Sequence, residues 1–442
     1  MKKNIFVVGL DNFNLKILKR IKGASNINFH PLLDYWEIRG CDEYPVEDLI
    51  NRCENRLNRF EGSIDGIIGY FDFPSTDIVP IICKKYSLPS ASIESVMKCE
   101  NKLWARMEQK KVIKDHMPEF RGFKPKDVHG QDQLDMSFPF WIKPVRSFKS
   151  YLAFNIINEN AFLQGIRKLK NSVHNITDPF RILLGYAQIP DDFKPFLDHS
   201  CIAESLLTGS QCTVEGYVYD KEVICYGIVD SIRDEDRSPF IGYEYPSRLP
   251  GYVKKEIINI SKRIMTHIQY DNATFNIEYF YNQVDDTVCL LEINPRCSQS
   301  HAHLFEKVDG VSNLAVMVDL ALGRKPQFKK GEGRFNCAAK YMVRVYENGI
   351  ITKIPGGKDI EKLKKLIPDA EIKILADVGT RLSDLENQDS YSYELMDIFI
   401  GAKDQRDLAL RYDTCLEMLQ LSMDLKFRRS KARKVYMKGG IK

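Results

Sequence analysis

The first 98 residues alternate between short apolar runs and segments with helical spacing. Residues 4–10 (NIFVVGL) and 64–71 (IDGIIGYF) have the length and composition of buried strands. Apolar positions in 13–21 and 76–86 recur every three to four residues, which predicts helices, the second beginning at a Ser-Thr-Asp cap. This alternation is typical of βαβ units in a parallel sheet. No GxGxxG motif follows the first strand, so dinucleotide binding is not supported.

The middle of the chain combines longer helices with pairs of strands. Helical spacing extends over four segments, which are 92–112 with Ser92 as its N-cap, 158–171, 252–268 and 311–322. Strand patterns occupy 139–145, 201–207, two runs flanking a tight Asp220-Lys221 turn, and a hairpin that joins 274–281 to 287–294. We therefore expect strands and helices to alternate through this region as well.

The pattern changes after residue 335. An Asn-Gly turn predicts a hairpin within 336–354, and helices are expected over 358–366 and 404–425, with strands at 370–376 and 393–401. These elements suggest a separate α+β lobe. The basic stretch that follows is either a solvated tail or a docking site for an acidic partner.

Composition narrows the class of protein. A chain of 442 residues is too long for one core, and a hydrophobic fraction of 44% is that of a globular protein. The net charge of +4 offers no case for nucleic acid, and no apolar run is long enough for a membrane span. Eleven cysteines without a CxxC pair favour a reducing, cytoplasmic location over a zinc ribbon or a disulfide framework.

The second strand of the 274–294 hairpin ends in LLEINPR, which carries chemistry on alternate residues. Residues two apart in a strand share a face, so Glu292 and Asn294 point the same way. The turn places Glu278 opposite position 291 or 292. Two carboxylates and an amide are ligands for Mg²⁺, and Arg296 continues the row toward a phosphoryl oxygen. The alternative is an acidic strand surface that faces solvent, which the apolar neighbours disfavour.

Two lysines and a connector are weaker signals. Lys143 lies within the apolar run FPFWIKP, where its charge needs a partner such as phosphate unless the side chain extends to the surface. Lys102 on the 92–112 helix has no special context of its own. The connector between Glu204 and Gln211 is of the kind whose backbone can contact a nucleotide base.

Seven stretches between about 100 and 330 resemble, in order and spacing, the ATP-grasp superfamily, of the carboxylate–amine ligase type that includes L-amino-acid ligases and biotin-carboxylase-like enzymes. They are NKLWARMEQK, FPFWIKPV, IAESLLTGSQCTVEGYV, YEYPSRLP, TFNIEYFY, LLEINPR and VDGVSNLAVMVDLALGRKP. The resemblance implies α/β and α+β architecture. The implied parts are a pre-ATP-grasp α/β domain at 1–98, an ATP-grasp domain at 99–330 with the nucleotide between two α+β subdomains, a C-terminal α+β lobe at 331–425 and a basic tail at 426–442.

The same resemblance implies roles for individual residues. Lys102 and Lys143 would hold the phosphates of ATP, and Glu204 and Leu207 would flank the adenine, chiefly through their backbone. Gln211 stands where the family usually has a glutamate that binds the ribose. The remaining implied residues are Glu278, Glu292 and Asn294 as ligands of Mg²⁺ (or Mn²⁺), and Arg296 as the arginine that faces the transferred phosphate and the acyl intermediate.

The expected function is an ATP-dependent carboxylate–amine ligase that acts through an acyl phosphate and releases ADP and phosphate. Its substrates would be small molecules, amino acids first among them, without nucleic acid or membrane, and a homodimer is a fair expectation. Arg233, Arg237 and Arg248 are candidates for binding a substrate carboxylate. His301 and His303 alternate like strand ligands, but no third ligand is evident for zinc.

Two alternatives stay open. One is a biotin-carboxylase-like enzyme that activates bicarbonate. The other is a catalytically degenerate ATP-binding protein, which the glycine-free sequence at 146–151 (RSFKSY) favours, because the family has a glycine- and serine-rich loop over the phosphates there.

Overall fold

The computed structural model describes residues 2–39, 45–146, 152–234, 239–385, 388 and 392–423. The chain divides into two compact units. The first comprises Met1–Gly227, Leu249–Gln299 and Asn313–Phe328, and the second comprises Ile228–Arg248, Ser300–Ser312 and Lys329–Lys442. The predicted basic tail at 426–442 lies outside the described residues, and the predicted domain boundaries stay predictions.

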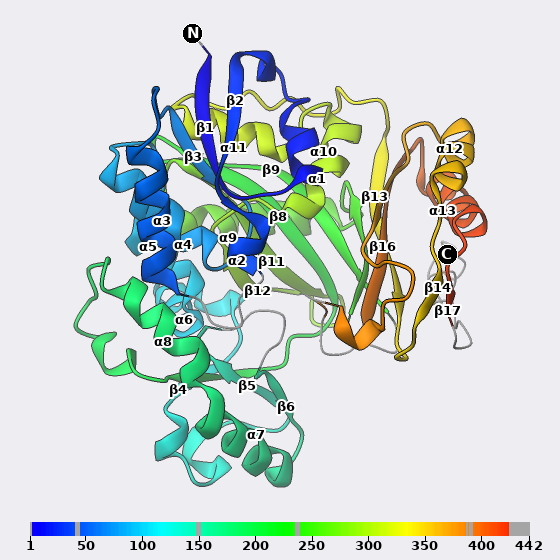
Figure 1. Cartoon of the computed structure of the whole chain (residues 1–442). Coiled ribbons are helices and arrows are strands. Elements are labelled where there is room, and N and C mark those ends of the chain that lie inside the picture. The colour runs from blue at the N-terminus through cyan, green and yellow to red at the C-terminus, as the bar shows by residue number, and fades with distance from the viewer. Residues whose placement is uncertain are drawn as a thin grey trace. The chain divides into compact units, whose positions relative to one another are not determined.

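The first unit begins with a small parallel sheet of order β2-β1-β3 (Figure 1). Its elements are β1 (Lys3–Leu10), α1 (Asn12–Leu18), β2 (Ile27–Asp34), α2 (Tyr35–Arg39), α3 (Val46–Asn58), β3 (Gly66–Gly69) and α4 (Ser75–Lys85). The predicted Ser-Thr-Asp cap of α4 is wrong, because the helix begins after Pro74 and the Ser75 hydroxyl instead donates to the carbonyl oxygen of Val8. The parallel βαβ prediction is confirmed, although β2 and α3 were not anticipated.

The helix expected over 92–112 is two helices. α5 (Ile93–Glu100) has the predicted N-cap at Ser92, whose hydroxyl accepts from the Ser95 amide. Asn101 then adopts an extended backbone, and its side chain accepts from the next amides to cap α6 (Lys102–Val112). A side-chain cap satisfies amides that an uninterrupted helix would have bonded internally, so Asn101 ends one helix by starting another.

A second, antiparallel sheet of order β4-β7-β5-β6 follows in this unit. Its strands are β4 (Phe120–Phe123), β5 (Phe140–Pro144), β6 (Phe154–Ile156) and β7 (Cys201–Ser205), with α7 (Glu159–Ser172) and α8 (His174–Leu184) between β6 and β7. Buried side chains of β5, β6, β7 and α7 share one hydrophobic core. The strand at 139–145 and the helix at 158–171 are confirmed.

The third sheet of the first unit has the order β12-β11-β8-β9. Its strands are β8 (Ser210–Tyr219), β9 (Glu222–Arg233), β11 (Ala273–Asn282) and β12 (Thr287–Asn294), with α9 (Gly251–His267) and α11 (Asn313–Ala321) also in the unit. The Asp220-Lys221 turn has positive φ at both residues, as a two-residue hairpin turn requires. α9 covers one face of this sheet, where the Ser261 and Tyr279 hydroxyls lie 2.7 Å apart.

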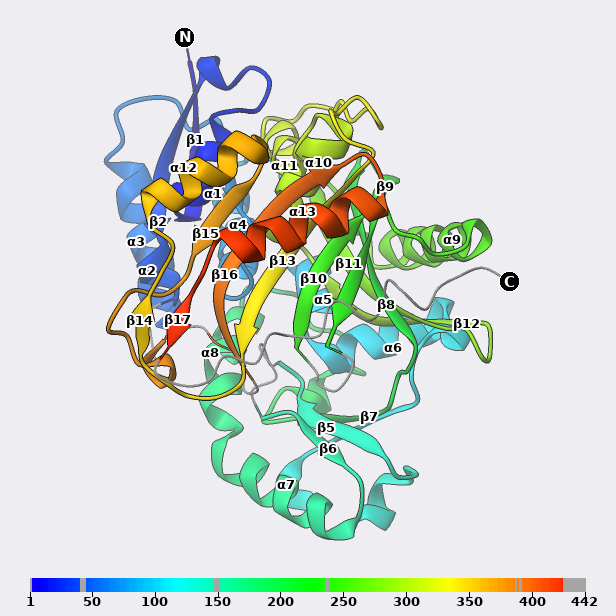
Figure 2. The same cartoon turned by 90° about the vertical axis from the view of Figure 1, so that its right-hand side faces the viewer.

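The second unit contains the residues of β9 from Ile228 onward, and the order of its strands is β9-β10-β13-β16-β15. Its elements are β10 (Phe240–Tyr245), α10 (Ala302–Asp309), β13 (Cys337–Val345), β14 (Ile351–Lys353), α12 (Gly357–Leu366), β15 (Glu371–Ile374), β16 (Tyr393–Ala402), α13 (Gln405–Met418) and β17 (Ser422–Met423). α12 and α13 lie along one face of β13, β15 and β16 and share their core (Figure 2).

Two predictions for the second unit are wrong. β13 and β14 do not form the expected hairpin, because β13 pairs with β10 and β16 while β14 pairs with β17. The last helix ends at Met418 and not at 425, and β17 follows it. The predicted α/β and α+β architecture is confirmed. In the described part of the chain, no helix combines the length and the hydrophobicity that crossing a lipid bilayer requires.

Candidate active site

The hairpin of β11 and β12 places the predicted metal ligands opposite one another. Glu278 pairs with Glu292, and Asn276 pairs with Asn294, across the two strands. Directly opposite residues share a face of the sheet. Because α9 contacts Tyr279 on the other face, these four side chains project from the face that α9 leaves uncovered.

Close contacts join the ligand candidates. Nδ2 of Asn294 lies 3.2 Å from Oδ1 of Asn276 and 3.4 Å from Oε1 of Glu278. Nε2 of Gln211, on β8, donates to the second oxygen of Glu278 at 2.6 Å. Glu292 is 37% exposed and lies 3.5 Å from Nζ of Lys102. The structure therefore brings Glu278, Glu292 and Asn294 together, with Gln211 beside them.

This donor set suits a hard divalent cation. Carboxylate and amide oxygens are the ligands that Mg²⁺ takes, usually one or two carboxylates completed by water and phosphate oxygens. Two carboxylates on one face repel each other unless positive charge lies near them, and Lys102 supplies one such charge. The residues present thus fit a magnesium ion that carries phosphate.

The two predicted phosphate-binding lysines also come together. The backbone amide of Lys102 donates to the carbonyl of Val145 at 2.8 Å, which attaches the start of α6 to the end of β5, the strand of Lys143. Burial lowers the pKa of Lys143, Glu204 opposes that shift, and the nearby charge of Lys102 lowers the pKa further. Two ammonium groups that disfavour each other are matched to an anion such as phosphate.

Glu204 occupies a buried ion-paired position. It is 4% exposed, and its oxygens lie 2.6 Å from Nε of Arg106 and 2.5 Å from Nζ of Lys143. Burial alone would raise the pKa of Glu204, but the two cations lower it to about 2. Glu204 lies on β7, between β4 and β5 in the sheet, and pairs with Phe120 on one side and Trp141 on the other. Leu207 is half-buried in the connector to β8.

Arg296 meets the N-terminal part of the same unit. Its Nε lies 2.5 Å from Oδ1 of Asp72, and Nη1 donates to the carbonyl of Cys297 at 3.3 Å. Burial disfavours the charge of Asp72, yet Arg296 outweighs burial and keeps the pKa of Asp72 below its usual value. Asp72 therefore orients the guanidinium from the side of β3.

Sequence reasoning missed several residues of this face. Glu215, on β8 opposite Asn276, is fully buried, accepts from the Asn276 amide at 2.8 Å and accepts from the Ser298 amide at 3.0 Å. It thus anchors the chain just beyond Arg296. The signal was present as alternate polar residues at 211, 213 and 215 (Gln, Thr, Glu) within a strand pattern.

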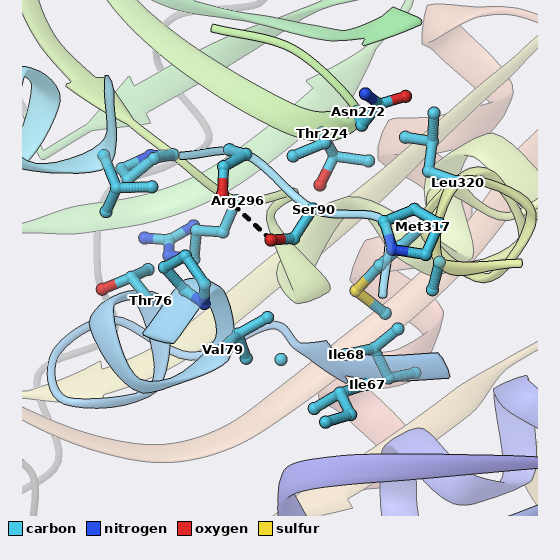
Figure 3. A pocket seen from close by; sticks show the side chains of 18 of the residues that line it. Ile67, Ile68, Thr76, Val79, Ser90, Asn272, Thr274, Arg296, Met317 and Leu320 are labelled. Atoms are coloured by element: carbon cyan, nitrogen blue, oxygen red, sulfur yellow. Dashed lines mark hydrogen bonds between the residues drawn. The ribbon is translucent and has the colours of Figure 1, made fainter. Parts of the chain in front are cut away.

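A small pocket lies next to Arg296, within the first unit (Figure 3). Its walls include the apolar side chains of Ile67, Ile68, Met317 and Leu320. Polar groups are Thr76, Ser90, Asn272 and Thr274, and the Ser90 hydroxyl donates to the carbonyl of Ala91 at 2.9 Å. Arg296 itself lines the pocket, and the described lining residues include no carboxylate or lysine, so the pocket is suited to an apolar group with an anionic end and not to a metal.

Arg146 is the first residue of the stretch that corresponds to the family's phosphate loop. Arg146 is buried between the rings of Phe73 and Phe180, where its guanidinium meets Asp77 and Glu100. The rest of the predicted phosphate loop, 147–151, lies outside the described residues.

In the second unit, Arg233 stacks on Phe240, and Arg248 lies near Asp230 and Glu244. Arg237 lies outside the described residues.

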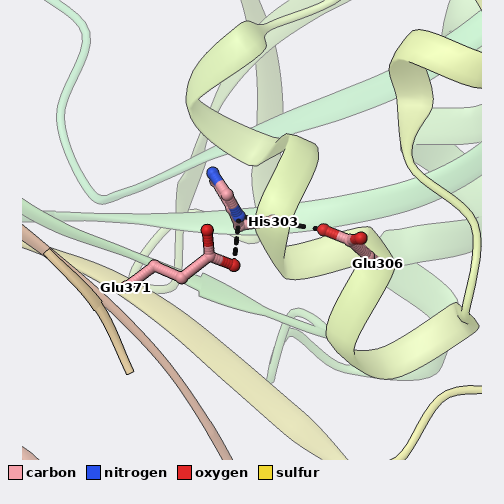
Figure 4. A group of neighbouring side chains, drawn as sticks. All are labelled: His303, Glu306 and Glu371. Atoms are coloured by element: carbon pink, nitrogen blue, oxygen red, sulfur yellow. Dashed lines mark ion pairs between the residues drawn. The ribbon is translucent and has the colours of Figure 1, made fainter. Parts of the chain in front are cut away.

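The two histidines do not alternate along a strand as expected. His301 ends a short 3₁₀ turn, Gln299–His301, and His303 lies on α10. The expectation that no third ligand lies nearby is also wrong, because Nδ1 of His303 is 3.1 Å from Glu371 and 3.8 Å from Glu306 (Figure 4). The three side chains thus meet within the second unit, a grouping that the sequence pattern did not predict.

Comparison with known proteins adds the family context. The family model described as the ATP-binding domain of the carbamoyl-phosphate synthase L chain matches residues 245–328, which contain the β11–β12 hairpin. No curated protein matches the chain in sequence. An L-amino acid ligase from Bacillus licheniformis superposes with a TM-score of 0.69 at 14% identity, covering 95% of this chain and 98% of that chain. The chain has the ATP-grasp fold.

Two further ATP-grasp structures are similar over nearly the whole length. A biotin carboxylase–β,γ-ATP complex from Campylobacter jejuni has a TM-score of 0.64 at 13% identity, over 96% of this chain and 92% of that chain. The biotin carboxylase domain dimer of the Hydrogenobacter thermophilus 2-oxoglutarate carboxylase, a complex with MgADP and bicarbonate, has a TM-score of 0.64 at 12% identity, over 96% and 91%. At identities this low, the similarity shows the ATP-grasp fold and does not identify the substrate.

Proposed function

We propose that this ATP-grasp protein is an ATP-dependent ligase that joins a small carboxylate, such as an amino acid, to an amine and releases ADP and phosphate. The observation that carries the proposal is the facing of Glu278, Glu292 and Asn294, with Lys102 3.5 Å from Glu292. A cation site beside a pair of lysines is complementary in charge to a magnesium-bound polyphosphate.

The chain's own residues divide the binding work. Glu278, Glu292 and the Asn294 amide oxygen would hold Mg²⁺ or Mn²⁺, while Lys102 and Lys143 would hold phosphate oxygens. Bound magnesium would neutralise charge on the phosphoryl oxygens during transfer. Glu204, ionised at neutral pH because its pKa is about 2, keeps Lys143 in place without a bound anion.

Arg296 would act at the carboxylate. Asp72 engages its Nε and the carbonyl of Cys297 its Nη1, so the guanidinium is oriented before any ligand arrives. An oriented guanidinium can hold the substrate carboxylate and then the acyl phosphate. An amine attacks the acyl carbon and expels phosphate. Positioning and charge neutralisation account for this chemistry, and no side-chain nucleophile is required.

The apolar pocket supports an amino acid as one substrate. It lies beside Arg296 and is walled by aliphatic side chains such as Ile68 and Leu320. An arginine next to an apolar wall suits a molecule with a carboxylate at one end and a hydrocarbon side chain at the other. We therefore propose amino acids with aliphatic side chains as the first substrates to test.

An ADP-release assay tests the proposal. The purified chain is incubated with ATP and Mg²⁺, with pooled amino acids, with an added amine, or with bicarbonate. Release that needs both an amino acid and an amine supports the ligase. Release that needs bicarbonate alone would instead establish a biotin-carboxylase-like activity, and ATP binding without release under any condition would establish a degenerate ATP-binding protein.

A pair of variants ties the activity to the hairpin. Glu278→Gln removes one carboxylate and is expected to lower turnover by about 100-fold or more, because a metal ligand is lost. Glu371→Gln, which removes a carboxylate beside His303 in the second unit, is the matched control and should retain turnover. Equal losses in both variants would contradict the assignment of the metal site.

A further inference from the structure

The facing of the two metal-ligand carboxylates depends on a single extra residue in β12. Tyr279 pairs with Leu290, but the next residue back, Glu278, pairs with Glu292, so Leu291 is a bulge. In a regular ladder Glu278 would face Leu291. Glu292 would then stand on the opposite face, because successive side chains alternate.

Burial along β12 confirms the change of phase. Before the bulge, the even-numbered Val288 and Leu290 are buried, at 6% and 0% exposure. Beyond it, the odd-numbered Ile293 is buried at 4%, and Glu292 and Asn294 are half-buried on the face of Glu278. The bulge therefore transfers even-numbered residues from the core face to the site face.

Arg106 donates hydrogen bonds to the backbone at the bulge. This residue of α6 is 3% exposed, and its Nη1 and Nη2 donate to the carbonyls of Leu290 at 3.2 Å and Leu291 at 2.6 Å. A bulge disrupts the ladder locally, and buried carbonyls there need other donors. The guanidinium supplies two of them from one rigid plane, which a lysine cannot do.

The same guanidinium also contacts Glu204, the partner of the predicted phosphate-binding residue Lys143. Its Nε is 2.6 Å from Glu204, which in turn lies 2.5 Å from Lys143. Oε1 of Gln109, one helical turn further along α6, accepts from Nη1 at 2.5 Å and completes the set. Arg106 thus connects the strand that carries the metal ligands to the strand pair that carries a phosphate-binding lysine.

We propose that Arg106 is a positioning residue for the cation site: it maintains the Leu291 bulge and thereby keeps Glu292 opposite Glu278. The inference rests on the proposed function, because it assumes that these carboxylates bind magnesium. Arg106 itself contacts neither metal nor substrate; it acts through the backbone of β12.

The test compares Arg106→Met with Arg56→Met. Arg56, on α3, is a control for the type of contact, because it also joins a backbone carbonyl, that of Leu32 at 2.6 Å, to a carboxylate, that of Glu37 at 2.8 Å, although its side chain is 44% exposed. Nucleotide binding is measured by calorimetry over a series of Mg²⁺ concentrations. We expect Arg106→Met to raise the Mg²⁺ concentration for half-maximal binding by about 10-fold, the effect typical of groups that orient metal ligands. Arg56→Met should leave it unchanged.

Two further variants separate positioning from general stability. Arg106→Lys keeps a charge near Glu204 but cannot serve both carbonyls, so an intermediate shift is expected. Deletion of Leu291 makes the ladder regular while Glu292 still faces Glu278, so Arg106→Met should shift the Mg²⁺ dependence less in that background. If the deletion variant does not fold, hydrogen exchange of the amides at 288–294 in Arg106→Met, expected to accelerate, reports on the bulge directly.

The outcomes separate the two proposals. Wild-type protein that binds no nucleotide in a magnesium-dependent way overturns the proposed function. Wild-type protein that does so, together with an unchanged Mg²⁺ dependence in Arg106→Met, overturns the positioning role alone. A shift of equal size in Arg56→Met would also overturn it, because the effect would then be one of stability.

Discussion

Two buried charge clusters, one in each unit, use the same residue types in different proportions. In the first unit, Glu204 lies between Arg106 and Lys143, one carboxylate with two cations. In the second unit, Lys340 lies 3.0 Å from Asp397 and 3.7 Å from Glu394, and Arg344 lies 2.6 Å from Glu394, two cations with two carboxylates.

The pKa values show how each cluster balances its charge. Burial and Glu394 raise the pKa of Asp397 to about 8, against the opposing effect of Lys340. Glu204 stays ionised and still leaves a positive excess around it. The comparison teaches that the second cluster has a carboxylate for each cation, whereas the first has one carboxylate for two cations and is suited to receive an anion.

The largest expected effect is on stability. Glu204→Gln leaves two buried cations without their carboxylate and should cost about 3–5 kcal/mol of unfolding free energy at pH 7. Asp397→Asn replaces a protonated acid by an amide of the same shape and should cost less than about 1 kcal/mol. Denaturant unfolding of both variants measures the difference, and similar losses would contradict the contrast between the clusters.

The next effect is on nucleotide affinity. Lys143→Met should weaken ATP binding by about 10- to 100-fold, because a charge-assisted hydrogen bond to phosphate is lost. Lys340→Met removes a buried lysine from the cluster of the second unit and should leave ATP affinity unchanged, whatever it does to stability. Calorimetric titration with MgATP checks both, and unaltered affinity in Lys143→Met would show that the positive excess does not serve the nucleotide.

The pH dependence of stability should run in opposite directions for the two clusters. The pKa of Glu204 is lowered on folding, so its contribution is full above about 4.5 and is lost as the pH falls toward 2. The pKa of Asp397 is raised, so the folded state loses stability relative to Asp397→Asn as the pH rises from about 4 to 8. Within each window we expect the difference between wild type and variant to change by up to about 1.4 kcal/mol per pH unit.

The smallest effect is expected when a second carboxylate is introduced next to Glu278, as Glu394 stands next to Asp397 in the second unit. Gln211→Glu replaces the 2.6 Å hydrogen bond to Glu278 by a pair of carboxylates, as at Glu394 and Asp397. Repulsion should lower the thermal midpoint by about 1 °C without divalent cation, and Mg²⁺ should restore it. Thermal unfolding with and without Mg²⁺ decides, and a midpoint that Mg²⁺ does not raise would argue against a cation at this place.

Local signals in the sequence predicted much of the fold. The Asp220-Lys221 turn and the apolar run ending at Lys143 depend on neighbours within a few residues, and both are confirmed. The break at Asn101 was missed because an asparagine in a helical pattern does not itself show which amides it will cap. The wrong hairpin at 336–354 has the same origin, because β13 pairs with strands distant in sequence and not with β14.

The candidate site was predictable in part for the same reason. Glu278, Glu292 and Asn294 follow from alternation within one hairpin. Their final register depends on a bulge whose carbonyls accept from Arg106, nearly two hundred positions away in sequence, which no local pattern contains. The change in apolar phase from Leu290 to Ile293 was the available sign of it. Roles in binding remain predictions for the experiments above.

The irregular residue in β12 has a practical consequence for aligning and redesigning this segment. Residues of the loop between β11 and β12 can be added or removed without altering which side chains of β12 share the face of Glu278, provided that the strands keep their pairing. Gain or loss of one residue between Glu292 and Asn294 would place those two side chains on opposite faces of the strand. Homologous positions should therefore be counted backward from Asn294, and not forward from the turn, when equivalent carboxylates are sought in a distant sequence.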